Sequence, residues 1–229
     1  MPVKELIEVI RMLFAPDDEF RQIVALTLTM SFYSTTFSAL IGIPAGVVLG
    51  CVDFPGKKLV MRITTTLMGL PPVVAGLAVF LLLSRSGPLG HFKLLFTLKA
   101  MVTAQVVLIT PIIAGLTATV VSLKYKRVFE TAWGMGLSKI RALVLTLSEC
   151  RSQMTGVVLT GFGRAISEVG AVSIVGGNVQ YKTRVMTTSI MMVTNMGRFE
   201  RAIALGLVLL AIAFAINIAV GMLSGESQL

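Results

Sequence analysis

The sequence predicts an all-α integral membrane protein with about five membrane-spanning helices. Hydrophobic residues make up 55% of the chain and charged residues 14%, and the mean hydropathy is +0.88. An ordinary soluble domain contains about 25% charged residues. The 229 residues, divided into spans of about 20 with short loops, leave no room for an additional soluble domain. We therefore expect any soluble function to reside on other chains.

The amino-terminal residues 1–20 are predicted to form an amphipathic helix that lies in the membrane surface. Apolar residues recur there with the helical period and charged residues occupy the other face. A secretory signal peptide is excluded because no continuous apolar region with a small-residue cleavage site precedes Pro16. Residues 21–229 are then expected to form one transmembrane domain.

The first two predicted spans cover residues 23–51 and 59–83. In the first, Gly42, Gly46 and Gly50 recur every four residues, which leaves one helix face without side chains and lets another backbone approach. The second contains Pro71 and Pro72 near its middle, so we expect a kinked or broken helix.

The remaining predicted spans cover residues 98–123, 143–175 and 202–223. A charged segment of residues 124–142 lies between the third and fourth spans. Within it, residues 128–140 carry apolar side chains along one helical face, which predicts a short amphipathic helix. A helix that merely rests at the lipid interface, where Trp133 is well suited, remains an alternative.

Charge and cysteine content exclude several classes of protein. The net charge is +9, but Lys and Arg lie singly or in short clusters at the ends of apolar runs rather than along one stripe, so nucleic acid is not expected as a partner. The two cysteines and one histidine have no metal-ligand spacing. No GxxxxGK[ST] motif occurs, so the chain itself is not expected to hydrolyse ATP.

The spacing Glu130-x-Ala132-x-x-x-Gly136 resembles the cytoplasmic coupling motif of binding-protein-dependent ABC importer permeases. Thr131 stands where that family usually has a second alanine. The resemblance implies a type I ABC importer permease fold and a segment 124–142 that docks on a separate ATPase. The implied coupling residues are Glu130, Thr131, Ala132, Gly134 and Gly136.

Residues 161–190 resemble the molybdate/tungstate branch of this family, most closely its tungstate-type permeases. There an Arg-x-x-x-Glu-x-Gly-Ala helix runs into an Asn-containing turn and a Thr-Arg segment. The resemblance indicates six residues of a translocation path or gate: Arg164, Glu168, Gly177, Asn178, Thr183 and Arg184.

The two charges of the fourth span are notable on physical grounds as well. A charged side chain at the centre of a membrane helix costs about 2.5–3.5 kcal/mol on insertion scales. Arg164 and Glu168 have i,i+4 spacing and can pair with each other. A purely structural ion pair and a role in the path both remain open.

Backbone amides at Gly177 and Asn178, with Lys182 and Arg184, offer suitable partners for an oxyanion. The two cations are equally suited to anchoring at the interface. Nearby methionines can form a constriction, although helix packing explains them more simply. They are Met186, Met191, Met192 and Met196.

The resemblance implies a permease subunit that is not catalytic and works in the prokaryotic inner membrane. Its implied partners are a second copy of the chain, two ATPase subunits that hold ATP and Mg²⁺, membrane lipid, and a periplasmic or lipid-anchored oxyanion-binding protein. Lys and Arg are distributed nearly evenly between the two sides, so charge alone does not decide the orientation. The resemblance places the amino terminus outside and residues 124–142 in the cytoplasm.

The expected cargo is tungstate or molybdate, with sulfate not excluded by the residues. One alternative function is an ion-coupled secondary transporter that uses Glu168 as a proton carrier tuned by Arg164, although the inverted repeat expected of such a protein is not visible. An intramembrane enzyme lacks a catalytic Ser/His, Asp/Asp or metal constellation in this sequence.

Overall fold

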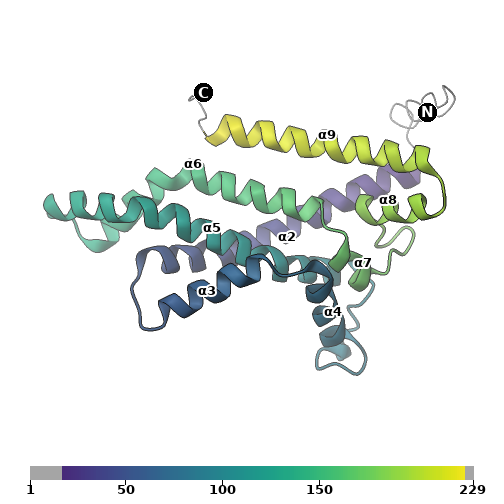
Figure 1. Ribbon diagram of the computed structural model, residues 1–229, viewed down its shortest axis with the longest axis horizontal. Coiled ribbons are helices and arrows are strands. Elements are labelled where there is room, and N and C mark those ends of the chain that lie inside the picture. The colour runs from purple at the N-terminus through teal and green to yellow at the C-terminus, as the bar shows by residue number, and fades with distance from the viewer. Residues whose placement is uncertain (1–16, 225–229) are drawn as a thin grey trace. The chain divides into compact units, whose positions relative to one another are not determined.

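A computed structural model describes residues 17–224, which are helical without a β-strand in that range (Figure 1). Most of the predicted surface helix, residues 1–16, lies outside the described part. Residues 18–20 form the first turn of the first long helix. In chain order the elements are α2 (Asp18–Cys51), α3 (Lys57–Met68), α4 (Pro72–Leu83), η1 (Gly90–Phe92), α5 (Leu98–Gly134), α6 (Lys139–Ile166), α7 (Gly170–Gly176), α8 (Met186–Asn195) and α9 (Phe199–Ser224).

Within the described residues, three helices are long and apolar enough to cross a membrane: α2, α5 and α9. The count rises to five if the interrupted pairs α3/α4 and α6/α7 each form one span. The predicted five spans therefore equal the upper count. The first interruption, at residues 69–71, is the one expected from Pro71 and Pro72.

The second interruption was not predicted. The fourth span was expected to continue from 143 to 175, but α6 ends at Ile166 and α7 begins at Gly170. Pro111 and Pro44, by contrast, lie inside continuous helices. A helix in a membrane tolerates proline where its neighbours satisfy the freed carbonyl, so proline alone does not locate the breaks.

The helices divide into two compact units. The first contains residues 17–34, 71–105 and 163–216, and the second contains residues 35–70, 106–162 and 217–224.

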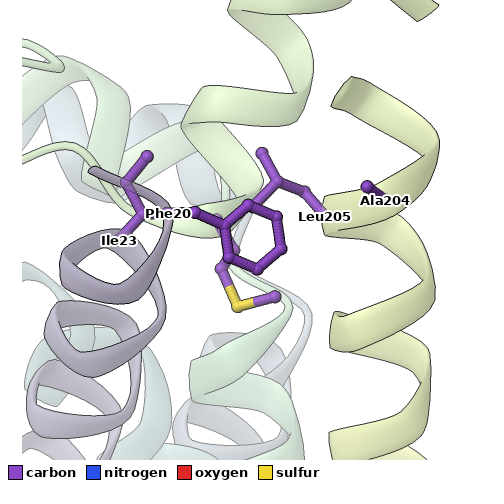
Figure 2. Packing of buried hydrophobic residues seen from close by; sticks show 5 residues of the cluster. Phe20, Ile23, Ala204 and Leu205 are labelled. Carbon is purple, nitrogen blue, oxygen red and sulfur yellow. The ribbon is translucent and has the colours of Figure 1, made fainter. Parts of the chain in front are cut away.

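The first unit is held by apolar contacts between segments that are far apart in sequence. Figure 2 shows Phe20 and Ile23 of α2 packed with Ala204 and Leu205 of α9, and Met186 of α8 completes this cluster. A second cluster joins α2, α5, α7 and the start of α8 through Met30, Met101, Val172 and Val185.

Helices α4 and α7 of the first unit lie side by side (Figure 1). A Cβ atom at Gly76 would lie 2.6 Å from the Cα atom of Ala171. A Cβ atom at Gly170 would lie 3.0 Å from Val73 Cγ2 of α4. The short helix after the break therefore packs against the short helix that begins at Pro72.

In the second unit, the three glycines of α2 face α5 at close range. A Cβ atom would lie 2.5 Å from the Ala114 carbonyl oxygen at Gly46, and 3.0 Å from a backbone oxygen of α5 at both Gly42 and Gly50. Real Cβ atoms do not approach other heavy atoms as closely as 2.5 Å. The structure thus brings the two helix backbones together along the stripe that the sequence singled out.

Candidate functional site

The charged segment 124–142 does not contain a separate short helix. Instead, α5 continues without interruption to Gly134, and α6 begins at Lys139. The predicted third span ends at residue 123, but the helix continues, because the residues that follow include the good helix formers Lys124, Arg127 and Ala132 and no glycine or proline before Gly134. Charge alone does not end a helix, so residues 124–134 extend it.

The helix ends in a tight turn at Gly136, which has φ +72. The Leu137 N–H donates to the Ala132 carbonyl at 2.9 Å, and the Gly136 N–H donates to the Trp133 carbonyl at 2.9 Å. These two bonds form the Schellman motif that commonly ends a helix at a glycine. Gly136 therefore sets the direction in which the chain turns toward α6.

The predicted coupling residues divide into buried and exposed ones. Ala132 is fully buried, whereas Glu130, Thr131 and Gly134 are exposed. The Thr131 hydroxyl donates to the Arg127 carbonyl at 3.0 Å. The end of the α5–α6 hairpin thus offers charged and polar groups that a partner protein can contact.

An aromatic row follows one side of the same helix end. The rings of Tyr125 and Phe129 lie 5.4 Å apart, and those of Phe129 and Trp133 lie 5.8 Å apart. Trp133 is 61% exposed. Further back, the Lys124 ammonium donates to the Glu149 carbonyl oxygen at 2.7 Å, which joins α5 to α6.

Arg164 and Glu168 form an ion pair at the break between α6 and α7. The Arg164 Nη1 atom lies 2.7 Å from Glu168 Oε2. The second carboxylate oxygen accepts the N–H of Ala171 at 3.1 Å, so Glu168 satisfies a donor at the start of α7. Glu168 is 3% exposed, while the Arg164 side chain is 34% exposed. The predicted pairing is present, and it lies where the helix is interrupted.

The carbonyl groups at this break are bound by residues that the sequence did not single out. Gln105 of α5 donates to the Ala165 carbonyl at 2.8 Å and accepts a hydrogen bond from Ser34 of α2. Thr187 of α8 donates to the Glu168 carbonyl at 2.7 Å. Gln105 is fully buried. An amide side chain in an otherwise apolar run was the signal that could have identified it.

The turn between α7 and α8 is internally bonded. Gly177 and Asn178 both have positive φ, at 66 and 50. The Thr183 hydroxyl donates to the Gly176 carbonyl at 2.6 Å and accepts the Val179 N–H at 2.9 Å. The Asn178 side-chain oxygen accepts a hydrogen bond from Thr188.

This bonding changes the prediction that the glycines offer exposed amides. The Gly177 N–H donates to the Ser173 carbonyl at 3.0 Å and is not free for a ligand. The turn at Gly177, Asn178 and Thr183 therefore supports the start of α8 in the present structure. Of the four methionines, Met186 is in the core, while Met191 and Met196 are exposed and Met192 sulfur contacts the Asn178 amide nitrogen at 3.4 Å.

Arg184 is paired rather than free. Its Nη1 atom lies 2.7 Å from Glu19 Oε1, and Arg201 Nη2 lies 2.9 Å from Glu19 Oε2. These residues come from α2, the α7–α8 turn and α9. No local pattern in the sequence signals this cluster, because its members are distant in the chain. Glu19 and Arg184, for example, are more than 160 positions apart.

No group of three or more His, Cys, Asp or Glu residues suitable for a metal occurs in the part of the chain that the structure describes. Cys51 and Cys150 are free thiols. The candidate site thus consists of the α5–α6 hairpin end in the second unit and the braced α6/α7 break in the first.

Comparison with known proteins identifies related chains. A family model described as "Binding-protein-dependent transport system inner membrane component" matches residues 42–225. The chain is similar to the tungstate uptake system permease protein of Peptoclostridium acidaminophilum, with 41% identity over 92% of each chain. It is also similar to a probable anion ABC transporter permease protein of Haloferax volcanii, with 39% identity over 85% of this chain and 86% of the relative. A Campylobacter jejuni tungstate uptake permease is 37% identical over 90% of this chain and 86% of its own.

Two solved structures share the fold. One is a bacterial ABC transporter involved in alginate import, with a TM-score of 0.73, 18% identity, and coverage of 100% of this chain and 85% of that chain. The other is the inward-facing MetNI methionine ABC transporter, with a TM-score of 0.63, 15% identity and coverage of 98% of both chains. The predicted type I importer permease fold is confirmed.

Proposed function

Because the chain belongs to the family of binding-protein-dependent transport system inner membrane components, we propose that it is the membrane subunit of an ATP-driven importer of tungstate. The observation that carries this proposal is the 41% identity with a tungstate uptake permease over 92% of both chains. Molybdate is the second choice of cargo, since it is likewise a divalent tetrahedral oxyanion. As a multi-pass membrane protein of this family, the chain works in the prokaryotic inner membrane.

The proposed complex contains two copies of this chain, because one copy encloses only part of a path and two ATPase sites act together. Two ATPase subunits bind ATP and Mg²⁺, and a periplasmic or lipid-anchored protein delivers the oxyanion. The permease itself is not catalytic. ATP binding on the partner subunits biases the permease between inward-open and outward-open states.

The end of the α5–α6 hairpin is the proposed ATPase contact. Glu130 and Trp133, at the end of the aromatic row, are exposed and can meet the partner, whereas Ala132 is buried. Because α5 is continuous from Leu98 to Gly134, a displacement of the hairpin end is transmitted along a single helix. The Schellman turn at Gly136 fixes the geometry of that contact.

The α6/α7 break is the proposed path or gate element. Its carbonyls and its one buried carboxylate are held by Arg164, Gln105 and Thr187. A break of this kind can change its angle without losing many helix hydrogen bonds, since few bonds cross it. Asn178 and Thr183 belong to the same element because their turn follows α7 directly.

A secondary transporter that carries protons on Glu168 is not favoured. The family and the relatives are components of ABC transporters. Both oxygens of Glu168 are already engaged, one by Arg164 and the other by the Ala171 N–H. No observation on the described residues supports this alternative independently.

The proposal is tested by the ATPase activity of the assembled complex in lipid nanodiscs. Addition of the binding protein loaded with tungstate should stimulate ATP hydrolysis above the level seen with the empty binding protein. Sulfate-loaded and molybdate-loaded forms report the selectivity of the complex. Equal hydrolysis with loaded and empty binding protein would contradict the proposed cargo, and no association with the ATPase would contradict the class.

A further inference from the structure

A polar pocket lies in the first unit beside the Glu19 ion pairs. Its volume is about 280 Å³. It is formed by the start of α2, the α7–α8 turn, α8 and the start of α9. Its polar lining consists of Glu19, Gln180, Arg184, Ser189, Arg198 and Arg201.

The Glu19 carboxylate lies between two guanidinium groups in this pocket. One oxygen accepts from Arg184 at 2.7 Å and from the Gln180 amide at 3.2 Å, and the other accepts from Arg201 at 2.9 Å. Two arginines that share one oxyanion with an amide donor beside them are arranged as in an anion-binding site. Here an internal carboxylate occupies that position.

Two arginines of the pocket carry donors without a partner among the described residues. The Nε atom of Arg184 is buried and has no hydrogen-bond partner. Ser189 also lines the pocket and is 1% exposed. Arg198 is exposed and forms no ion pair among residues 17–224. A buried donor without an acceptor costs free energy, which an incoming acceptor can recover.

The charge of the lining matches a dianion. Three guanidinium groups and one carboxylate leave two positive charges in the pocket. Asp17 lies 3.5 Å from Arg201 outside the lining and is 59% exposed, so solvent screens it. The volume is also adequate, because four oxygens of about 30 Å³ each need roughly 120 Å³.

We propose that this pocket binds a tetrahedral divalent oxyanion and that Glu19 competes with it for Arg184 and Arg201. The choice of tungstate as that oxyanion rests on the proposed function. Competition by a tethered carboxylate lowers the affinity of the pocket for the oxyanion. A low affinity suits a site that must both bind cargo and release it. The site is separate from the Arg164–Glu168 pair, which is braced by different residues.

Two alternative roles of the arginine cluster lead to different experimental results. The cluster can act only as a clasp that joins α2, the α7–α8 turn and α9, in which case it binds no free anion. The arginines can instead contact an acidic surface of the binding protein. Neither role requires the free donors of Arg184 and Arg198 to meet a small ion.

The test is tungstate binding to the full chain in neutral-lipid nanodiscs, measured by equilibrium dialysis with detection of the metal. Arg198→Gln should weaken binding by about tenfold, since it removes one charged donor. Glu19→Gln should strengthen binding by about tenfold, because it neutralises the competitor. Arg85→Gln is the matched control: Arg85 is exposed, belongs to the same unit and lies outside this pocket, so binding should not change.

Unchanged tungstate binding in Arg198→Gln would overturn the proposal, and so would weaker binding in a folded Glu19→Gln variant. The Arg198→Gln variant still tests the proposal if Glu19→Gln fails to fold. We expect Arg198→Gln to fold, because Arg198 is exposed and forms no ion pair among the described residues. Loss of binding-protein association in Arg198→Gln with normal tungstate binding would assign the arginines to protein docking instead. A wild-type complex that hydrolyses ATP in response to tungstate while the pocket binds none would overturn this inference and leave the proposed function intact.

Discussion

Removal of either partner of the Arg164–Glu168 pair should destabilise the protein, and by unequal amounts. Arg164→Ala leaves a carboxylate that is 3% exposed without its cation, which costs about 3–5 kcal/mol for a buried pair. Glu168→Ala removes the acceptor of the buried Ala171 N–H, at a cost of about 1–3 kcal/mol. Arg164 is then unpaired, but it is 34% exposed and its long side chain can extend toward polar surroundings. We therefore expect the arginine variant to be the less stable of the two.

The double variant Arg164→Ala/Glu168→Ala should recover much of this loss, because no unpaired charge remains. The coupling energy should be about 2–3 kcal/mol, at the upper end for contacting residues. Free energies of unfolding from SDS titration in mixed micelles give this value. The Lys57–Asp53 pair is the matched control: it has the same i,i+4 spacing at 2.9 Å, but Asp53 is 97% exposed. Its coupling should be about 0.3–0.5 kcal/mol.

Uptake by the same variants separates a structural role from a role in the path. If the pair only braces the α6/α7 break, the double variant regains both stability and uptake. We expect stability to recover while uptake stays low, because Glu168 belongs to the proposed gate. Normal uptake by both single variants, or a coupling energy no larger than that of the Lys57 control, would refute the reasoning.

Three further variants test the helix contact, the hairpin end and the topology. Gly46→Ala should destabilise the protein by about 1–3 kcal/mol in SDS titration, because the added methyl group overpacks against α5. The control Gly206→Ala should be neutral or stabilising, because its methyl group meets no atom within 4 Å. Equal effects of the two variants would contradict the close approach of α2 and α5. Gly136→Leu forces a side chain to φ +72, at about 1–2 kcal/mol, and should lower ATPase co-purification without changing membrane insertion; full transport would contradict the assignment. In a cysteine-free background, an impermeant reagent applied to spheroplasts should label a cysteine at Ser86 but not at Ser138, and the reverse pattern would invert the proposed topology.

Local sequence signals predicted the features that depend on nearby residues. The Arg164–Glu168 pair follows from i,i+4 spacing, and the α3/α4 interruption follows from Pro71 and Pro72. The α6/α7 interruption has no proline. There the backbone is held by Gln105 and Thr187, which are distant in sequence, so periodicity alone predicted a continuous span.

Features that depend on distant residues, or on a choice between competing local signals, were missed. The Glu19 cluster joins three segments that only the fold brings together. The separate short helix predicted over residues 128–140 is absent, because α5 continues through the charged residues after position 123 to Gly134. No glycine or proline interrupts the chain between residue 123 and Gly134, so a helix can continue through these charges.

The most direct test of the proposed transport function is uptake of tungstate into proteoliposomes that contain the permease, its ATPase and a binding protein. We expect uptake that requires ATP and the binding protein and that continues when a proton uncoupler is present. Uptake that proceeds without ATP and stops on addition of the uncoupler would contradict this function and favour an ion-coupled transporter.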